Sequence, residues 1–209
     1  MQEIVLNHIS VDKITDAVFA ENGIGADVLR LDKIHPFISG NKWFKLRYYI
    51  REAKQQNKKT LLSFGGPWSN HIIAIAAAGE LYGFKTTGII RGEEPAELSP
   101  TLQQAKAMGM QLIFSSREDY KQKRIPLVSI DDTYIINEGG YGMNGADGAA
   151  TILDHCRKEI YTHLCCAAGT GTMAAGLANA ADPQTTILAL SVLKNNHSIG
   201  ENMFIGRWK

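Results

Sequence analysis

The sequence predicts an α/β protein in which parallel sheets are covered by helices on both faces. Strand-like and helix-like segments alternate along the chain, and the strand-like segments are apolar along their length, as strands are when both faces of a sheet are buried. Three of these segments end in polar, glycine-rich turns. Open sheets of this kind bind ligands at the carboxyl ends of their strands, so a ligand site is expected there.

The strand-like segments are short runs of β-branched and other apolar residues. Most of them stop at glycine or serine. They are 27–31, 60–66, 85–92, 110–116, 133–140, 163–169 and 185–193.

Helix-like segments follow most of the strands. Residues 42–56 carry apolar side chains at helical spacing, which predicts one buried face. Ser69 or Asn70 stands at the natural N-cap position of an alanine-rich helix, and Ser99 begins a helix that should end at Gly109. Two further helical stretches are 147–160 and 170–181.

Composition and charge exclude several classes of function. The 209 residues carry 22 Lys and Arg against 21 Asp and Glu, so no global field draws the chain to nucleic acid or to an anionic membrane. The most apolar segment, 72–79, is far below the roughly 20 residues that a membrane span requires. The amino terminus has neither a positive region nor a long apolar run, and a cytoplasmic protein is expected.

The three cysteines are Cys156, Cys165 and Cys166. They are too few and too unevenly spaced for a disulfide framework or a four-ligand metal site, and no metal is predicted. Cys165 and Cys166 lie in an apolar run, so both are expected to be buried core residues. A catalytic thiol is the minor alternative.

The turn Gly169-Thr170-Gly171-Thr172 lies between a strand and an alanine-rich helix. Its N–H groups and the helix dipole, roughly half a positive charge, suit a phosphate. A plain turn in which glycine relieves crowding is the alternative. The segment also fits the dinucleotide pattern G-x-G-x-x-A, but Lys194 ends the segment where that pattern expects an acidic residue about 20 positions on. NAD is therefore disfavoured, NADP is a weak alternative, and a cofactor with one phosphate fits better.

Two lysines stand near a predicted helix start in the segment SGNKWFKL, residues 39–46. If Asn41 caps this helix, Lys42 lies in the first turn, where the dipole disfavours an ammonium and raises the share of nucleophilic amine. Lys45 lies on the same side but gains less of this effect. An amine beside a phosphate turn indicates pyridoxal phosphate held as a Schiff base on Lys42. Lys42 and Lys45 are both expected to be cofactor-binding residues.

Four motifs also carry a resemblance to a known family. In chain order they are SGNKWFKL, SFGGPWSNH, INEGGYG and AAGTGTM. Together they resemble the tryptophan-synthase-like, fold type II enzymes that use pyridoxal phosphate, most closely the family of 1-aminocyclopropane-1-carboxylate deaminase and D-cysteine desulfhydrase. The likeness runs from about residue 20 to about residue 194.

The resemblance implies a two-domain fold of the tryptophan synthase β type. Residues 45–135 would form a small mobile domain, and residues 1–44 and 136–209 a larger cofactor domain. The family continues with further strands and helices, so the carboxyl-terminal part of the larger domain is expected to be missing here. The strand 185–193 would then have an exposed apolar edge that favours a homodimer.

The resemblance also implies roles for individual residues. Lys42 would hold the cofactor covalently and move protons, and Ser69 would meet the substrate carboxylate or take part in proton transfer. Asn70 would bind the ring hydroxyl, His71 would lie near the ring, and the 169–172 turn would surround the phosphate. Each has a structural alternative: Ser69 and Asn70 as helix caps, and His71 as an ordinary first-turn histidine.

The implied reaction is that of a deaminase or desulfhydrase, a hydrolase or lyase. It removes a leaving group and ammonia from 1-aminocyclopropane-1-carboxylate or D-cysteine and leaves a 2-keto acid. Because the family's later segments complete the pocket, this chain is expected to be a poor catalyst. A non-catalytic relic that binds a phosphate or a partner chain is one alternative, and an NADP-type oxidoreductase is another.

Overall fold

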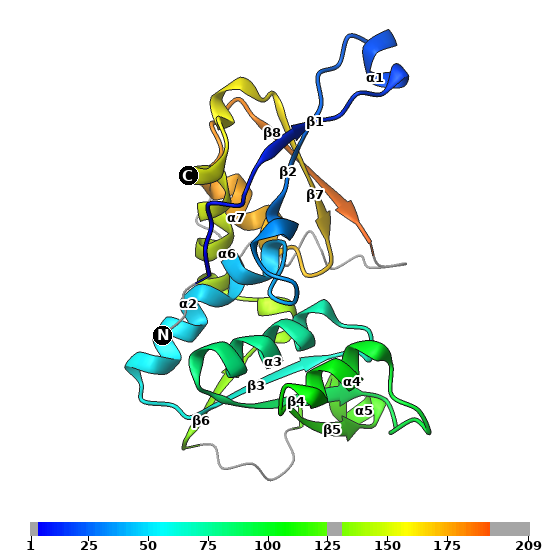
Figure 1. Cartoon of the computed structure of the whole chain (residues 1–209), viewed down its shortest axis with the longest axis vertical. Coiled ribbons are helices and arrows are strands. Elements are labelled where there is room, and N and C mark those ends of the chain that lie inside the picture. The colour runs from blue at the N-terminus through cyan, green and yellow to red at the C-terminus, as the bar shows by residue number, and fades with distance from the viewer. Residues whose placement is uncertain (1–3, 125–130, 193–209) are drawn as a thin grey trace.

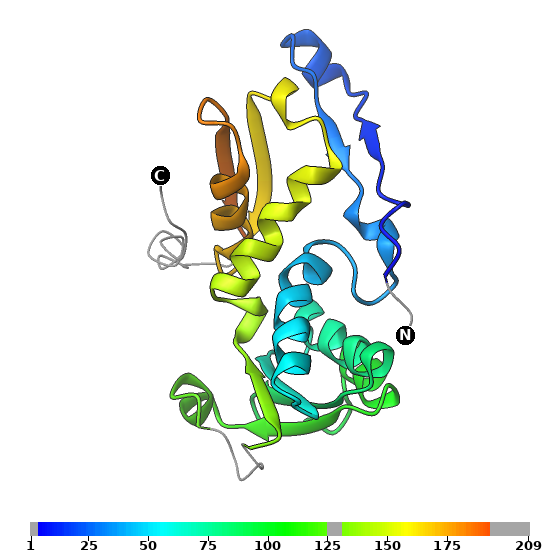
Figure 2. The ribbon, with the colours of Figure 1, turned by 90° about the vertical axis from the view of Figure 1, so that its left-hand side faces the viewer.

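The computed structural model describes residues 4–124 and 131–192 (Figures 1 and 2). The strands are β1 (Val11–Lys13), β2 (Asp27–Leu29), β3 (Thr60–Gly65), β4 (Lys85–Arg91), β5 (Gln111–Ser115), β6 (Thr133–Ile136), β7 (His163–Ala168) and β8 (Thr186–Ser191). The α-helices are α1 (Ala17–Glu21), α2 (Asn41–Gln55), α3 (Asn70–Tyr82), α4 (Pro100–Ala107), α5 (Arg117–Lys121), α6 (Met143–Ala150) and α7 (Thr172–Ala180). The 3-10 turns are η1 (Leu31–Ile34), η2 (Glu138–Gly140), η3 (Thr151–His155) and η4 (Lys158–Ile160).

The largest sheet has four parallel strands in the order β5-β4-β3-β6. Because side chains alternate along a strand, Leu61 of β3 packs with α2, α3 and α4 on one face. Its neighbour Leu62 packs on the other face with Tyr120 of α5. The predicted α/β class, with parallel strands and helices on both faces, is therefore confirmed.

A second core lies beside this sheet, and α2 joins the two. The second core contains Phe44 of α2, Cys166 of β7, and Ala174 and Leu177 of α7. Leu46 of the same α2 belongs to the first core. Figure 2 shows α6 running beside α2 between the two regions. The predicted division into a small and a large domain stays a prediction.

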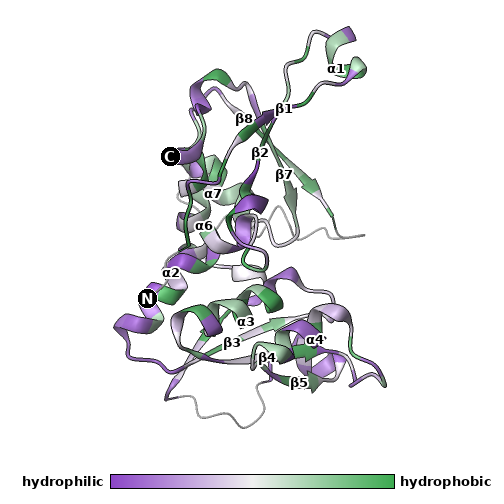
Figure 3. Cartoon of the chain, in the orientation of Figure 1, coloured by the Kyte–Doolittle hydropathy of each residue, from purple (hydrophilic) through white to green (hydrophobic). Residues whose placement is uncertain are grey.

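The strands β7 and β8 are parallel and are covered on one face by α7. On the other face of this two-stranded sheet, Cys165, Leu188 and Leu190 are exposed. The prediction that Cys165 is buried is wrong, because alternation along β7 directs it away from α7 while Cys166 is directed inward. Figure 3 shows the apolar colouring along both strands.

We propose that this bare face associates with a second copy of the chain. Leu190 is 64% exposed, and burying a leucine contributes about 1.5 to 3 kcal/mol. Leu190→Lys is expected to weaken self-association about tenfold or more in sedimentation velocity experiments. Ile160→Lys is the matched control, because Ile160 is 57% exposed on η4. A wild-type chain that stays monomeric at every concentration would contradict the proposal.

The helix predicted over 147–160 differs from the observed one. The observed helix, α6, begins at Met143 and ends at Ala150. Thr151 Oγ1 donates to the carbonyl of Gly148 at 2.7 Å, which competes with the helical hydrogen bonding there. A Cβ at Gly148 would lie 1.9 Å from the carbonyl oxygen of Phe44, so only glycine permits this close approach of α6 to α2.

Two kinds of feature are absent from the described ranges, 4–124 and 131–192. No helix there is long and apolar enough to cross a membrane. No group of three or more His, Cys, Asp and Glu side chains there could hold a metal ion.

Candidate active site

The start of α2 places Lys42 beside α7. The N-cap is Gly40, with a φ of 60° that favours glycine, and not Asn41 as the sequence indicates. Asn41 is instead the first helical residue, and its Oδ1 accepts a hydrogen bond from Lys42 Nζ at 2.7 Å. Asn41 Nδ2 lies 3.1 Å from Met173 Sδ, so this side chain ties Lys42 to the first turn of α7.

Lys42 lines a pocket of about 360 Å³. Ser39, Gly40 and Asn41 form one wall of this pocket, and Asn70 at the start of α3 contributes to another. Burial lowers the pKa of Lys42 below its usual value. Burial therefore favours the neutral amine of Lys42 more than in a free lysine, as a nucleophile requires.

Lys45 lies one turn further along α2 and is only 5% exposed. Its Nζ donates to the carbonyl oxygen of Gly139 at 2.9 Å. Burial first, and then the charge of Lys42, lower the pKa of Lys45 to about 7. The lower pKa favours Lys45 as a nucleophile, whereas access favours Lys42, which lines the pocket and, within the described residues, bonds only to the amide of Asn41.

The start of α3 presents Ser69 and Asn70. Of the two predicted N-cap candidates, Ser69 is the N-cap, and its Oγ accepts from the N–H groups of His71 and Ile72 at 3.3 and 3.4 Å. The Ser69 hydroxyl hydrogen is left to donate elsewhere. Asn70 is exposed and faces the same pocket as Lys42.

His71 is buried beneath these residues and is 2% exposed. Ser63 Oγ donates to the carbonyl of Ile136 at 2.7 Å, so at 2.8 Å it accepts from His71 Nε2. His71 Nδ1 is then unprotonated, and it has no hydrogen-bond partner in the described part of the chain. Burial, followed by the charges of Lys42 and Lys45, lowers the pKa of His71 to about 3, so the ring is neutral.

The turn at 169–172 leads into α7. Thr172 is fully buried, and its Oγ1 lies 2.9 Å from Thr170 Oγ1. Gly171 is the N-cap of α7, and within residues 4–124 and 131–192 no side chain caps this helix, so its first N–H groups have no side-chain acceptor there. A Cβ at Gly139 would lie 2.8 Å from Thr170 Cγ2, which places this turn against the turn that binds Lys45.

The structure thus brings the predicted site residues to one region. Lys42 and Lys45 come from α2, Ser69 to His71 come from the start of α3, and the 169–172 turn comes from the start of α7. Sequence reasoning missed Ser63, the partner of His71. The signal in the sequence is weak, because Ser63 is a single polar residue within the apolar strand 60–66. Only the structure shows that it points toward His71 of α3.

The chain was compared with protein families and with curated relatives. Residues 16–201 match the family described as "Pyridoxal-phosphate dependent enzyme". The "Putative 1-aminocyclopropane-1-carboxylate deaminase" of Thermotoga maritima is 30% identical over 151 residues, which are 66% of this chain and 48% of that protein. The chain therefore spans about half the length of this relative.

Solved structures show the same fold. The structure described as an ACC deaminase homologue has a TM-score of 0.77 at 20% identity, covering 97% of this chain and 66% of that one. A threonine deaminase isoform from Solanum lycopersicum has a TM-score of 0.62 at 17% identity, covering 83% of this chain and 48% of that one.

Proposed function

Because the chain belongs to the family of pyridoxal-phosphate-dependent enzymes, we propose that it binds this cofactor through Lys42 and acts on a small amino acid. The proposed substrates are 1-aminocyclopropane-1-carboxylate and D-cysteine. Hydrolysis of the first gives a 2-keto acid and ammonia, and D-cysteine releases sulfide in addition. The observation that carries this proposal is the half-buried amine of Lys42 in a pocket that the start of α3 also lines, next to the contact of Asn41 with Met173 of α7.

The residues present fit pyridoxal phosphate. The uncapped start of α7, together with the hydroxyl groups of Thr170 and Thr172, offers donors to a phosphate. Lys42 offers an amine of lowered pKa to an aldehyde. When bound, the cofactor supplies a ring that stabilises negative charge developing on the substrate.

The chain's own residues have separate tasks in this proposal. Asn41 Oδ1 holds the Lys42 amine in the pocket, and Lys42 Nζ would accept and return a proton at the substrate carbon. The Ser69 hydroxyl and the Asn70 amide lie at the start of α3, where a carboxylate is favoured. Neutral His71 adds no charge beneath them, and Lys45, bound to Gly139, supplies positive charge whenever it is protonated.

The choice of substrate rests on two supports. The name of the Thermotoga maritima relative favours 1-aminocyclopropane-1-carboxylate, and the motif resemblance adds D-cysteine. The chain spans 48% of that relative, so the activity of the whole protein is proposed and not established. A cytoplasmic location is likewise proposed and not established.

A keto-acid assay across both enantiomers of small amino acids tests the reaction. We expect turnover with 1-aminocyclopropane-1-carboxylate or D-cysteine, accompanied by ammonia in equal amount. Exclusive turnover of bulky substrates would contradict the proposal. So would reduction of NADP without any change in the visible absorbance of added pyridoxal phosphate, which would favour an oxidoreductase.

Thr172→Val is expected to weaken pyridoxal phosphate binding by about 1 to 3 kcal/mol, the usual range for losing a hydrogen bond to a charged group. Thr172 is fully buried, and valine keeps its shape while removing only the hydroxyl. Titration followed by absorbance measures the change. Lys194→Ala serves as the comparison, at a residue outside the described part of the chain. If only Lys194→Ala weakens binding, the 169–172 turn does not hold the phosphate.

A further inference from the structure

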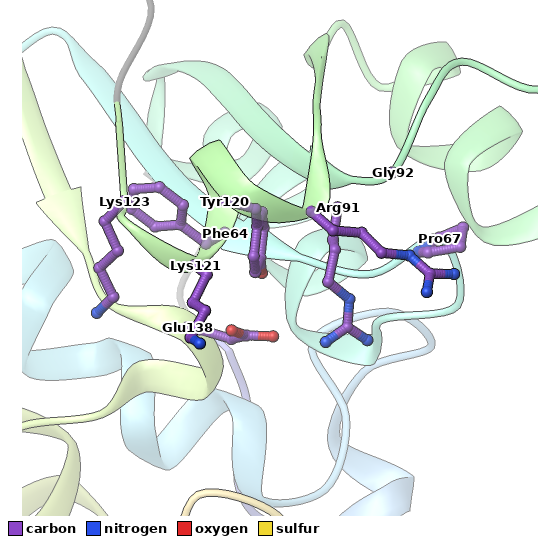
Figure 4. A pocket seen from close by; sticks show the side chains of 9 residues that line it. Phe64, Pro67, Arg91, Gly92, Tyr120, Lys121, Lys123 and Glu138 are labelled. Carbon is purple, nitrogen blue, oxygen red and sulfur yellow. The ribbon is translucent and has the colours of Figure 1, made fainter.

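We propose that the chain has a second binding site, for a small polyanion, on the face of the four-stranded sheet that bears Tyr120 and not α3 (Figure 4). The site is a pocket of about 710 Å³ between the ends of β3 and β4 and the helix α5. None of its lining residues also lines the pocket of Lys42. Phe64 of β3 points into this pocket, while its neighbour Ser63 points toward α3 and His71.

Charge is the first support for an anionic ligand. Four cationic side chains line the pocket, Arg91, Arg117, Lys121 and Lys123, against the single carboxylate of Glu138 among the lining residues of the described chain. Arg91, Arg117 and Lys121 form no ion pair or hydrogen bond with the side chains described here, whereas Lys123 Nζ donates to Asn137 Oδ1 at 3.3 Å. A concave surface with this surplus of positive charge attracts anions.

A buried hydroxyl is the second, independent support. Tyr120 lines the pocket and is only 8% exposed, and its Oη makes no hydrogen bond of ordinary length in the structure of residues 4–124 and 131–192, although the Glu138 carboxylate lies nearby. Buried polar groups in native proteins normally have a partner, so this atom calls for one. Burial, and then the charge of the nearby Glu138 carboxylate and its weak hydrogen bonding to the hydroxyl, raise the pKa of Tyr120, so the hydroxyl stays protonated and remains a donor.

The packing around Tyr120 holds that hydroxyl in place. The Phe64 ring meets the Tyr120 ring edge-on at 6.1 Å, and the Arg91 guanidinium lies over the Tyr120 ring at 5.8 Å. Figure 4 shows Tyr120 between the side chains of Glu138 and Arg91, with Lys121 and Lys123 on the far side from Arg91. A ligand with at least two negative groups can therefore meet cations on both sides of the tyrosine.

The ligand is a small molecule with phosphate or carboxylate groups. Guanidinium groups bind both kinds of anion through paired N–H donors. The volume exceeds what one phosphate ion fills and lies within the range of ordinary small-molecule sites. Inorganic pyrophosphate and citrate are therefore the two probes, one for each kind of anion.

Calorimetric titration of the purified full chain tests the proposal. We expect saturable binding of at least one probe, and about tenfold or weaker binding in the double variant Arg91→Gln/Arg117→Gln. The control Lys85→Gln/Lys106→Gln removes the same charge from exposed lysines outside the pocket and should change affinity less than about twofold. Tyr120→Phe removes only the hydroxyl and should weaken binding about three- to tenfold.

Four results would overturn the proposal. The first is that neither probe shows saturable binding. The second is that the control variant loses as much affinity as the arginine variant. Binding could be lost in Thr172→Val and kept in the arginine variant, which would place the ion at the 169–172 turn. Unchanged affinity in Tyr120→Phe would show that surface charge alone attracts the ion. Pyridoxal phosphate labelling of Lys42 is measured separately, so failure of the proposed function and failure of this site are distinguishable.

Discussion

Lys42→Ala is expected to abolish covalent attachment of pyridoxal phosphate and to lower any turnover by about a thousandfold or more. No other amine in the described structure combines a place in this pocket with a lowered pKa. Borohydride reduction of the loaded protein, followed by peptide mapping, should find the label on the peptide that contains Lys42. The variant should show none.

Lys45→Met is the informative comparison, because Lys45 has the more strongly lowered pKa of the two. Methionine keeps the length of the side chain and removes its charge. We expect the label to remain on Lys42 in this variant, with weaker cofactor affinity. A label on Lys45 in the wild type, or its loss in Lys45→Met alone, would show that the lower pKa outweighs access to the pocket.

Parts of the fold and site follow from local sequence. Ser69 and Ser99 cap their helices as predicted, because an N-cap depends on a side chain and on N–H groups two or three residues away. The strands β3, β4 and β5 match the predicted runs within a residue or two, because each contains a short run of β-branched and other apolar residues that ends at glycine or serine. The coincidence of four motifs then identified the family.

The remainder depends on contacts between distant parts of the chain. Asn41 is not the cap of α2, because its side chain is engaged by Lys42 and by Met173, which lies 132 residues further along. The partner of Lys45 is Gly139, 94 residues away, and no local pattern indicates this contact. Cys165 is exposed because nothing in the described chain covers that face of β7, and this could not be inferred from an apolar run.

The stability of the protein without cofactor is expected to rise steeply between about pH 7 and pH 10.5, and Lys45 is the reason. Burial, followed by the charge of Lys42, lowers the pKa of Lys45 in the folded chain to about 7, from an ordinary value of 10.5. Below pH 7 both the folded and the unfolded chain carry the proton, and the folded state then contains a poorly hydrated charge. Between the two pKa values the unfolded chain binds more protons, so the free energy of unfolding increases with pH.

The size of the effect follows from the same two pKa values. Each unit of difference corresponds to about 1.4 kcal/mol, so Lys45 accounts for roughly 4 to 5 kcal/mol across this window. His71 acts in a separate pH range. Its pKa is about 3 in the folded chain and ordinarily 6.5, so the free energy of unfolding falls as the pH drops from 6.5 toward 3. The two residues can therefore be distinguished by pH alone.

Lys45→Met should remove most of this dependence and leave the smaller part that comes from Lys42, whose pKa burial also lowers. At pH 7 the variant is expected to be more stable than the wild type by about 2 to 4 kcal/mol, because the loss of the bond to Gly139 offsets about 1 kcal/mol of the gain. Urea unfolding at several pH values measures both proteins, and their difference isolates Lys45 from other groups such as Cys166. Lys106→Met, at an exposed lysine, is the control and should leave the profile unchanged. Two results would contradict this prediction: a Lys45→Met variant that is less stable than the wild type at pH 7, or one whose free energy of unfolding has the same slope up to pH 10.5. Either would show that the buried Lys45 charge does not destabilise the fold.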